Sequence, residues 1–220
     1  MPTLTPGRPL LSTHSRRRVG WLAVACAIFV VAGGVLVAGQ THPDPFDNAV
    51  DSPIIARFGD HAGVLLFLAA PGTRLPVFVV TAVLAVACLL ARRLNGAILA
   101  VLAIALSTGL DDYVLKPLFD RRYFGSLVYP SGHTTAVVTF AATLTVLLAS
   151  AAGSGRWRWP ARLVLVLAWA DTIVVATSVI ALRWHYFSDT LAGAAVAIAV
   201  VCGLALALDQ PRLRSPQTGE

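Results

Sequence analysis

Apolar segments long enough to cross a bilayer alternate with short polar ones along most of the chain. Six segments have this length: about 19–40, 75–91, 96–115, 133–151, 163–182 and 189–208. The apolar piece 62–70 is too short to cross alone, so it either lies at the membrane interface or begins the next helix. Because a backbone inside a bilayer must satisfy its own hydrogen bonds, the pattern predicts an all-α, polytopic membrane protein with a bundle of six transmembrane helices.

The polar stretches set the expected domain limits. Residues 1–18 are polar, rich in proline and end in three arginines, which predicts a short disordered tail, and residues 209–220 form a second tail. Residues 19–208 between them are predicted to form one six-helix domain, with a polar loop over 41–61. The first apolar segment, which follows three arginines, also fits a cleaved signal peptide, but its length favours a retained helix.

The composition narrows the class of protein. With 57% hydrophobic and only 13% charged residues, it excludes a soluble domain of this size. The net charge of +6 does not indicate a nucleic-acid partner, because the arginines occur in short clusters between apolar segments rather than on one face. The three cysteines lie inside apolar segments without metal-ligand spacing. A single lysine among many arginines and alanines is typical of a GC-rich bacterial genome.

The basic residues predict the orientation in the membrane. Six crossings place both termini on one side, and eleven of the seventeen basic residues fall on that side: Arg8, Arg16, Arg17, Arg18, Arg92, Arg93, Arg156, Arg158, Arg162, Arg212 and Arg214. Since basic residues are enriched on the cytoplasmic side, we expect cytoplasmic termini. The polar segments 116–130 and 183–188 are then expected to face the outside of the cell membrane.

The stretch Tyr129-Pro130-Ser131-Gly132-His133 is the first candidate site. It lies where a polar segment becomes an apolar helix, and Pro130 separates it from what precedes. Ser131 is a good N-cap, and Gly132 allows a backbone to approach a ligand closely. Amides in the first turn of a helix bind anions, and His133 adds a titratable group there. An ordinary helix start with an incidental histidine remains the plainer interpretation.

Two predicted outer segments carry titratable or cationic side chains: Lys116, Arg121, Arg122 and His133 in the first, and Arg183, His185 and Asp189 in the second. His185 and Asp189 are four residues apart, so on a helix they share a face. The carboxylate can hold one imidazole N–H and leave the other nitrogen facing a substrate. Two histidines, a carboxylate and up to four cations suit phosphoryl transfer, in which one histidine attacks phosphorus and the other protonates the leaving oxygen.

Each feature taken alone has another interpretation. The pair His185 and Asp189 also fits a helix-cap hydrogen bond. Lys116, Arg121 and Arg122 also fit anchors that extend to lipid headgroups. A metal site is disfavoured, because two histidines and one aspartate on separate segments lack ligand spacing.

Three further carboxylates lie within or beside the apolar segments. A carboxylate inside a membrane is by default a functional candidate. We nevertheless expect Asp171, in the fifth span, to be structural and to pair with a neighbouring hydroxyl such as Thr172. Asp111 and Asp112 precede Lys116 by about one helical turn, and we expect them to pair with Lys116 or Arg121 or to cap the third span.

The whole pattern resembles the type-2 phosphatidic-acid phosphatase family, membrane lipid-phosphate phosphatases related to vanadium haloperoxidases. That family has three motifs, Lys-x6-Arg-Pro, Pro-Ser-Gly-His and Ser-Arg-x5-His-x3-Asp. Residues 130–133 match the second in full, His185 and Asp189 match the end of the third, and Ser178 and Lys116 match the starts of the third and first. By motif, the resemblance covers about residues 116–193.

The chain departs from the family at two arginine positions, where it has Tyr123, followed by Phe124 instead of proline, and Val179. Three other arginines are candidate replacements: Arg121, favoured over Arg122, for the first position, and Arg183 for the second.

The resemblance implies a role for each site residue. His185 is the nucleophile that forms a phosphohistidine, Asp189 orients it and stabilises its charge, and His133 acts as general acid and then as general base. The phosphoryl oxygens are held by the remaining candidates: Lys116, Arg121 or Arg122, Arg183, Ser131 and the Gly132 amide. No metal or other cofactor is implied, because the cations offset the charge that Mg²⁺ offsets elsewhere.

The implied activity is metal-independent hydrolysis of a lipid phosphate or diphosphate at the membrane. Phosphatidic acid, phosphatidylglycerol phosphate and polyprenyl diphosphates are the candidate substrates. Tyr123 and Val179 motivate an alternative, a non-catalytic lipid-phosphate-binding or transport component. A haloperoxidase shares the anion pocket, but the membrane spans argue against it.

Overall fold

The computed structural model describes residues 9–149 and 155–209. Its helices are α1 (Thr13–Val37), α2 (Pro45–Phe58), α3 (Ala62–Ala69), the 3₁₀ turn η1 (Ala70–Gly72), α4 (Arg74–Leu90), α5 (Leu94–Leu110), α6 (Lys116–Phe119), α7 (Gly132–Leu148), α8 (Arg158–Ala181) and α9 (Phe187–Leu208). A π-helical turn, Asp111–Leu115, joins α5 to α6. A short antiparallel hairpin, β1 (Arg122–Tyr123) and β2 (Ser126–Leu127), follows α6.

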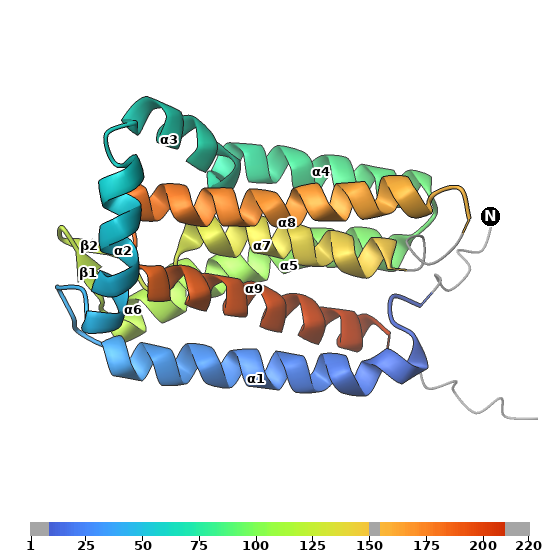
Figure 1. Ribbon diagram of the computed structural model, residues 1–220. Helices are drawn as coiled ribbons and strands as arrows, with labels where there is room; N and C mark the ends of the chain where they lie inside the picture. The colour runs from blue at the N-terminus through green and yellow to red at the C-terminus, as the bar shows by residue number, and fades with distance from the viewer. Residues whose placement is uncertain (1–8, 150–154, 210–220) are drawn as a thin grey trace, which may run out of the picture.

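In the part of the chain that the structure describes, the long helices run side by side along one axis (Figure 1): α1, α4, α5, α7, α8 and α9. Within the described residues, five helical segments are long and apolar enough to cross a bilayer: Thr13–Val37, Ala62–Leu90, Leu94–Phe119, Arg158–Ala181 and Phe187–Leu208. The sixth helix, α7, is apolar but has 17 residues, which corresponds to a length of about 25 Å. The predicted six-helix membrane bundle is therefore confirmed.

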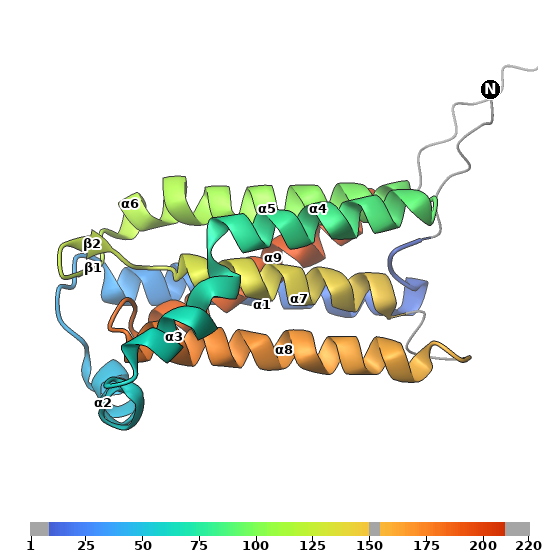
Figure 2. The ribbon, with the colours of Figure 1, turned by 90° about the horizontal axis from the view of Figure 1, so that it is seen from above.

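Helix α7 lies inside the bundle and packs against α5, α8 and α9 (Figure 2). Eleven of its 17 residues are buried, and they are mainly alanine, valine and threonine. Its contact with α9 is close at Gly193, where an added Cβ would lie 2.6 Å from the carbonyl oxygen of Ser131. Small residues allow helix backbones in membranes to approach in this way. The start of α7 is thus fixed directly against α9.

The two ends of the described chain meet at one end of the bundle. The amides of Leu10 and Leu11 donate hydrogen bonds to the Asp209 carboxylate, at 2.8 and 2.7 Å, and Arg16 Nη1 donates to the Asp209 carbonyl oxygen at 2.9 Å. This meeting is what an even number of crossings requires. The hairpin and α2 lie at the opposite end (Figure 1).

Helix α1 begins earlier than the sequence predicts. Ser12 caps it by accepting a hydrogen bond from the Ser15 amide at 3.3 Å, and the three arginines 16–18 lie within the helix. The predicted disordered tail is therefore wrong for residues 13–18, because a capping serine starts the helix before the apolar segment does. Residues 1–8 and 210–220 of the two predicted tails lie outside the described residues.

Residues 41–61, predicted to be a loop, contain α2. Asp44 caps this helix by accepting a hydrogen bond from the Asp47 amide at 2.8 Å, and Pro45 occupies the first helical position, where its missing N–H costs nothing. Helix α2 lies across the end of the bundle (Figure 1). The apolar piece 62–70 forms α3, which packs against α8 and leads through η1 into α4.

Candidate active site

A pocket of about 860 Å³ lies at the end of the bundle that carries the hairpin. Along α4 and α5 its wall is apolar, with Val77, Phe78 and Ile104. Its polar part brings together five of the predicted site residues: Lys116, Gly132, His133, Arg183 and His185. The other four predicted residues, Arg121, Arg122, Ser131 and Asp189, do not line it.

The start of α7 forms one wall of the pocket. Ser131 is buried and caps the helix, its hydroxyl accepting a hydrogen bond from the Thr134 amide at 3.5 Å, so it supports this wall from behind. An added Cβ at Gly132 would lie 3.2 Å from Lys116 Nζ. Lys116 therefore lies directly against the first turn of α7, whose amides have no acceptor within the helix. A cation beside the first-turn amides of a helix makes a site suited to an anion.

The His185 imidazole is held in one tautomer. Its side chain is 10% exposed, and its Nδ1 lies 3.0 Å from the carbonyl oxygen of Val128. Because a carbonyl oxygen only accepts, Nδ1 carries the proton and Nε2 keeps its lone pair. Burial, together with nearby His133 and Lys116, lowers the pKa of His185 to about 3. The ring is therefore neutral at physiological pH, which is the form that can act as a nucleophile.

His133 faces His185 from the first turn of α7. The two ring centroids are 6.3 Å apart, and the His133 ring also lies against Trp184 at 5.3 Å. Gly72, at the end of η1, contacts His133 closely, since an added Cβ there would lie 2.9 Å from the His133 Cβ. His133 is thus enclosed on two sides and presented to the same pocket as His185.

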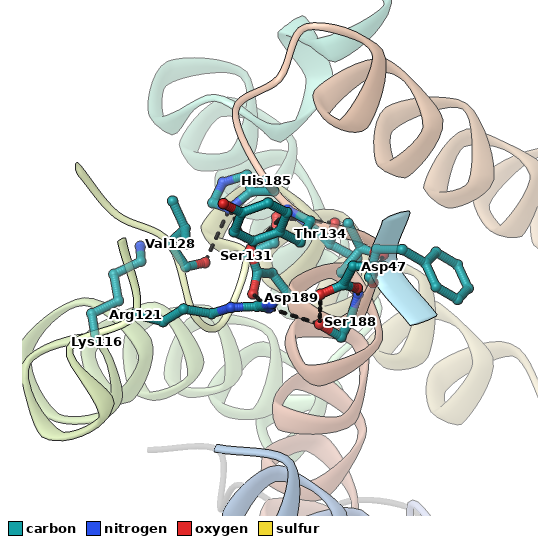
Figure 3. A network of polar contacts seen from close by, with 12 residues as sticks. Asp47, Lys116, Arg121, Val128, Ser131, Thr134, His185, Ser188 and Asp189 are labelled. Atoms are coloured by element: carbon teal, nitrogen blue, oxygen red, sulfur yellow. Dashed lines mark hydrogen bonds and ion pairs between the residues drawn. The ribbon is translucent and has the colours of Figure 1, made fainter. Parts of the chain in front are cut away.

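Asp189 does not hydrogen-bond to His185 as the sequence led us to expect. Its Oδ2 lies 3.9 Å from His185 Nδ1, beyond hydrogen-bonding distance. Instead, Oδ2 accepts a hydrogen bond from the Tyr186 amide at 2.9 Å, and Oδ1 binds Arg121 Nη1 at 2.6 Å (Figure 3). The Val128 carbonyl, a backbone group with no sequence signature, takes the place expected for the carboxylate.

Neither arginine favoured for the first missing family position reaches the pocket. Arg121 is fully buried, and its guanidinium forms salt bridges with Asp47 at 2.5 Å and Asp189 at 2.6 Å. Arg122 lies at the surface, paired with Asp120 at 2.8 Å. Helix α6 ends at Asp120 in a left-handed conformation, φ 46°, so the chain turns there and Arg121 enters the bundle. The predicted phosphate contacts of both arginines are therefore not supported.

Arg183 lines the pocket, as predicted for the replacement of the second missing arginine. Val179, which occupies the family position, belongs to α8 and is fully buried in a core cluster with Ala69 and Val137. The structure adds Arg74, at the start of α4, to the cations that line the pocket. The sequence analysis did not select Arg74, because it belongs to no motif. The one indication was that a basic residue stood on the predicted outer side of the membrane.

Two carboxylates lie beside these cations. Asp112 contacts Lys116 Nζ at 2.5 Å and Arg74 Nη2 at 3.6 Å, and buried Asp111 lies 3.8 Å from Lys116 Nζ. The predicted pairing with Lys116 is confirmed, and the alternative pairing with Arg121 is not seen. Both carboxylates belong to the π-helical turn, a feature that occurs often at functional sites.

Asp171 lies in α8 and does not line the pocket. The hydrogen bond predicted from Thr172 is absent, because that hydroxyl donates to the Trp169 carbonyl oxygen at 2.7 Å. Among residues 9–149 and 155–209, no three His, Cys, Asp or Glu side chains are grouped so as to hold a metal ion.

A family model for the PAP2 superfamily matches residues 62–212. The chain belongs to the PAP2 superfamily. The matched region contains Lys116, residues 130–133, His185 and Asp189, so the resemblance inferred from the motifs is confirmed. The matched region begins after α1 and α2.

The fold of this PAP2 protein is similar to a solved structure, "Crystal structure of the first transmembrane PAP2 type phosphatidylglycerolphosphate phosphatase from Bacillus subtilis". The TM-score is 0.67 with 16% sequence identity, over 88% of this chain and 100% of that chain. At this identity the likeness establishes the multi-pass membrane fold. No curated protein matches the chain.

Proposed function

We propose that this PAP2 protein is an integral-membrane phosphatase that removes the terminal phosphate of a lipid phosphate or diphosphate through a phosphohistidine intermediate. The observation that carries the proposal is the pair of histidines facing one pocket, beside a lysine and the N-terminus of α7. His185 presents an unprotonated Nε2, and His133 faces it from the other wall. Neither a simple core packing role nor a helix cap accounts for this arrangement.

The two histidines divide the chemistry. In the first step, His185 Nε2 attacks phosphorus and the bond from phosphorus to the ester oxygen breaks, while protonated His133 gives its proton to that oxygen. In the second step, His133 accepts a proton from water, whose oxygen attacks phosphorus and releases inorganic phosphate and free His185. The Val128 carbonyl keeps its hydrogen bond from Nδ1–H throughout, and the Asp189 carboxylate nearby stabilises the positive charge on the phosphorylated ring.

The charges of the pocket suit the phosphoryl group. Lys116, Arg183 and the Gly132 amide would hold its oxygens, with Arg74 as the added cation at the edge. Hydrogen-bond donors aimed at the phosphoryl oxygens stabilise the charge that spreads over them in the transition state. We therefore expect hydrolysis without a divalent metal.

The apolar wall supports a lipid substrate. Val77, Phe78 and Ile104 continue the pocket along α4 and α5, so a phosphate held at Lys116 can place its hydrocarbon chain against membrane-facing helices. Phosphatidic acid, phosphatidylglycerol phosphate and polyprenyl diphosphates all fit this description, and the similar solved structure is named as a phosphatidylglycerolphosphate phosphatase. The distribution of arginines supports cytoplasmic termini and a pocket on the outer side of the cell membrane.

Phosphate release by purified protein in detergent tests the proposal. The panel contains the three candidate lipids, with EDTA present, and compares the wild type with His185→Gln and with the surface control Arg122→Gln. We expect release by the wild type and the control, insensitive to EDTA, and none by His185→Gln. An alkali-stable, acid-labile phosphoryl label should form on the wild type and on Arg122→Gln but not on His185→Gln. Full release by His185→Gln, or a strict Mg²⁺ requirement, would contradict the mechanism.

A second candidate function, a non-catalytic lipid-phosphate binder, is favoured by one observation. Tyr123 stands where the family has an arginine, and the arginine favoured as its replacement, Arg121, is buried and does not line the pocket. Folded protein that binds lipid phosphates but releases no phosphate from any of them would establish this function instead.

A further inference from the structure

His185 is held through two groups, and Arg121 bonds to both. The Val128 carbonyl accepts the Nδ1–H of His185, and the Val128 amide donates to the Arg121 carbonyl oxygen at 3.0 Å. Asp189 Oδ2 lies 3.9 Å from the same nitrogen, and Asp189 Oδ1 binds the Arg121 guanidinium. The backbone and the side chain of one residue therefore fix both neighbours of the His185 ring.

The guanidinium of Arg121 is enclosed on all sides by protein. Nη1 donates to Asp189 at 2.6 Å and to the Ser188 hydroxyl at 2.7 Å, and Nη2 donates to Asp47 at 2.5 Å (Figure 3). The Tyr186 ring covers its face, with Cζ 4.3 Å from the ring centroid. A planar, forked donor set of this kind imposes direction on its acceptors, which a lysine ammonium does not.

Asp47 reaches this network from α2, outside the family-matched residues 62–212. Its Oδ1 accepts a hydrogen bond from the Ser188 amide at 2.8 Å, and its Oδ2 accepts one from the Ser188 hydroxyl at 2.9 Å. Asp51, one turn along α2, accepts from the Phe187 amide at 3.1 Å. The carboxylates of α2 thus accept hydrogen bonds from amides in the first turn of α9, the helix that follows His185. These amides are therefore not available to bind phosphate.

We propose that Arg121 and Asp47 are positioning residues: they hold Asp189 and Val128, and through them they keep His185 in one tautomer with Nε2 directed into the pocket. The inference rests on the proposed function for its kinetic consequences. The competing role for Arg121 is direct contact with the phosphoryl group, which its complete burial and its absence from the pocket lining oppose.

Kinetics separates the two roles. In Arg121→Lys and Asp47→Asn we expect kcat to fall about 10- to 100-fold, the range found for groups that orient a reacting side chain. KM and the inhibition constant for inorganic phosphate, the reaction product, should stay within about twofold, because the groups that hold phosphate are intact. The matched control Arg122→Lys should behave as the wild type. A rise in KM and in the phosphate inhibition constant that accounts for the lost kcat/KM would overturn the inference in favour of phosphate binding.

A second measurement does not depend on turnover. ¹⁵N NMR of histidine-labelled protein in detergent reports the tautomer of His185, whose signal is assigned by its loss in His185→Gln. We expect a single Nδ1–H form in the wild type and a mixture in Arg121→Lys and Asp47→Asn. Folded variants with an unchanged tautomer and unchanged kcat would refute the positioning role.

The kinetic and NMR measurements test the positioning role and the proposed function separately. A wild type that hydrolyses no lipid, but whose variants change tautomer, would reject the function and keep the positioning role. If Arg121→Lys does not fold, Asp47→Asn gives the same test, since asparagine keeps an acceptor for the Ser188 amide.

Discussion

Gly72 contacts His133 so closely that adding one methyl group, in Gly72→Ala, tests whether the position of His133 matters for activity. Gly72 ends η1 beside the pocket, and Gly72→Ala would place its Cβ 2.9 Å from the His133 Cβ and 3.1 Å from both its Cα and its Cδ2. The Cα is backbone and the Cβ is the root of the side chain, so neither can rotate away, and only the ring atom Cδ2 can turn aside. Carbon atoms pack best at about 3.5–4.0 Å, and the two segments must therefore separate by about 0.6–1.1 Å.

The expected effect has two parts. Overpacking of this kind costs about 1–3 kcal/mol of folding stability. A displacement of about 1 Å at a reacting group can cost about 10²-fold in rate. We therefore expect kcat for lipid phosphate hydrolysis to fall by about 10- to 100-fold in Gly72→Ala, with a lower unfolding temperature in detergent.

Gly63→Ala is the matched control. Gly63 lies in α3, and its added Cβ would have no atom within 4 Å. Activity should be unchanged, and stability should be equal or slightly higher, because alanine in a helix is favoured over glycine by about 0.5–1 kcal/mol. Equal kcat and equal unfolding temperatures for Gly72→Ala and Gly63→Ala would refute the placement of His133 against η1 as a requirement for activity.

Two further predictions concern charge. Arg183→Gln should raise KM for the lipid phosphate about 10- to 100-fold, the worth of a hydrogen bond to a charged group, whereas Arg122→Gln should not change it; equal KM values would remove Arg183 from the phosphate site. Burial, followed by the charge of Asp47, raises the pKa of Asp51 to about 7, above about 3.9 in an unfolded chain. Its stabilising contribution is therefore complete below about pH 4 and is lost as the pH rises through about 7. Asp51→Asn keeps an acceptor for the Phe187 amide but cannot ionise. The unfolding temperature of this variant should therefore fall less between about pH 5 and 8 than that of the wild type. An equal fall in both proteins would contradict the role of Asp51 in the pH dependence of stability.

The parts of the site that are local in sequence could be predicted. Ser131 caps α7, Gly132 lies against Lys116, and His133 enters the pocket from the first turn, all within a few residues of one helix start. The membrane-spanning helices could be predicted equally well, because a bilayer requires long apolar helices. Arg183 was also placed correctly, since it precedes His185 by two residues.

The parts that depend on chain direction or on distant partners could not be predicted. A left-handed residue at Asp120 sends Arg121 into the bundle, and no pattern of residue types announced that turn. The partner of Arg121 in α2, Asp47, is 74 residues away in sequence. The group that orients His185 is the Val128 carbonyl, and a backbone oxygen is the same in every residue. Helix α2 itself was hidden, because its prolines and aspartates are typical of loops as well as of helix starts.

The segments that precede the family-matched region complete the end of the bundle that holds the pocket. Besides Asp47, they supply the Val30 carbonyl that accepts the hydroxyl of buried Tyr129 at 2.7 Å, and the bare backbone at Gly34 against which the Phe119 ring lies. A chain that started at residue 62 would retain every motif, but the buried guanidinium of Arg121 would lack its partner Asp47. The unit that must fold together in this protein is therefore longer than the family-matched residues 62–212.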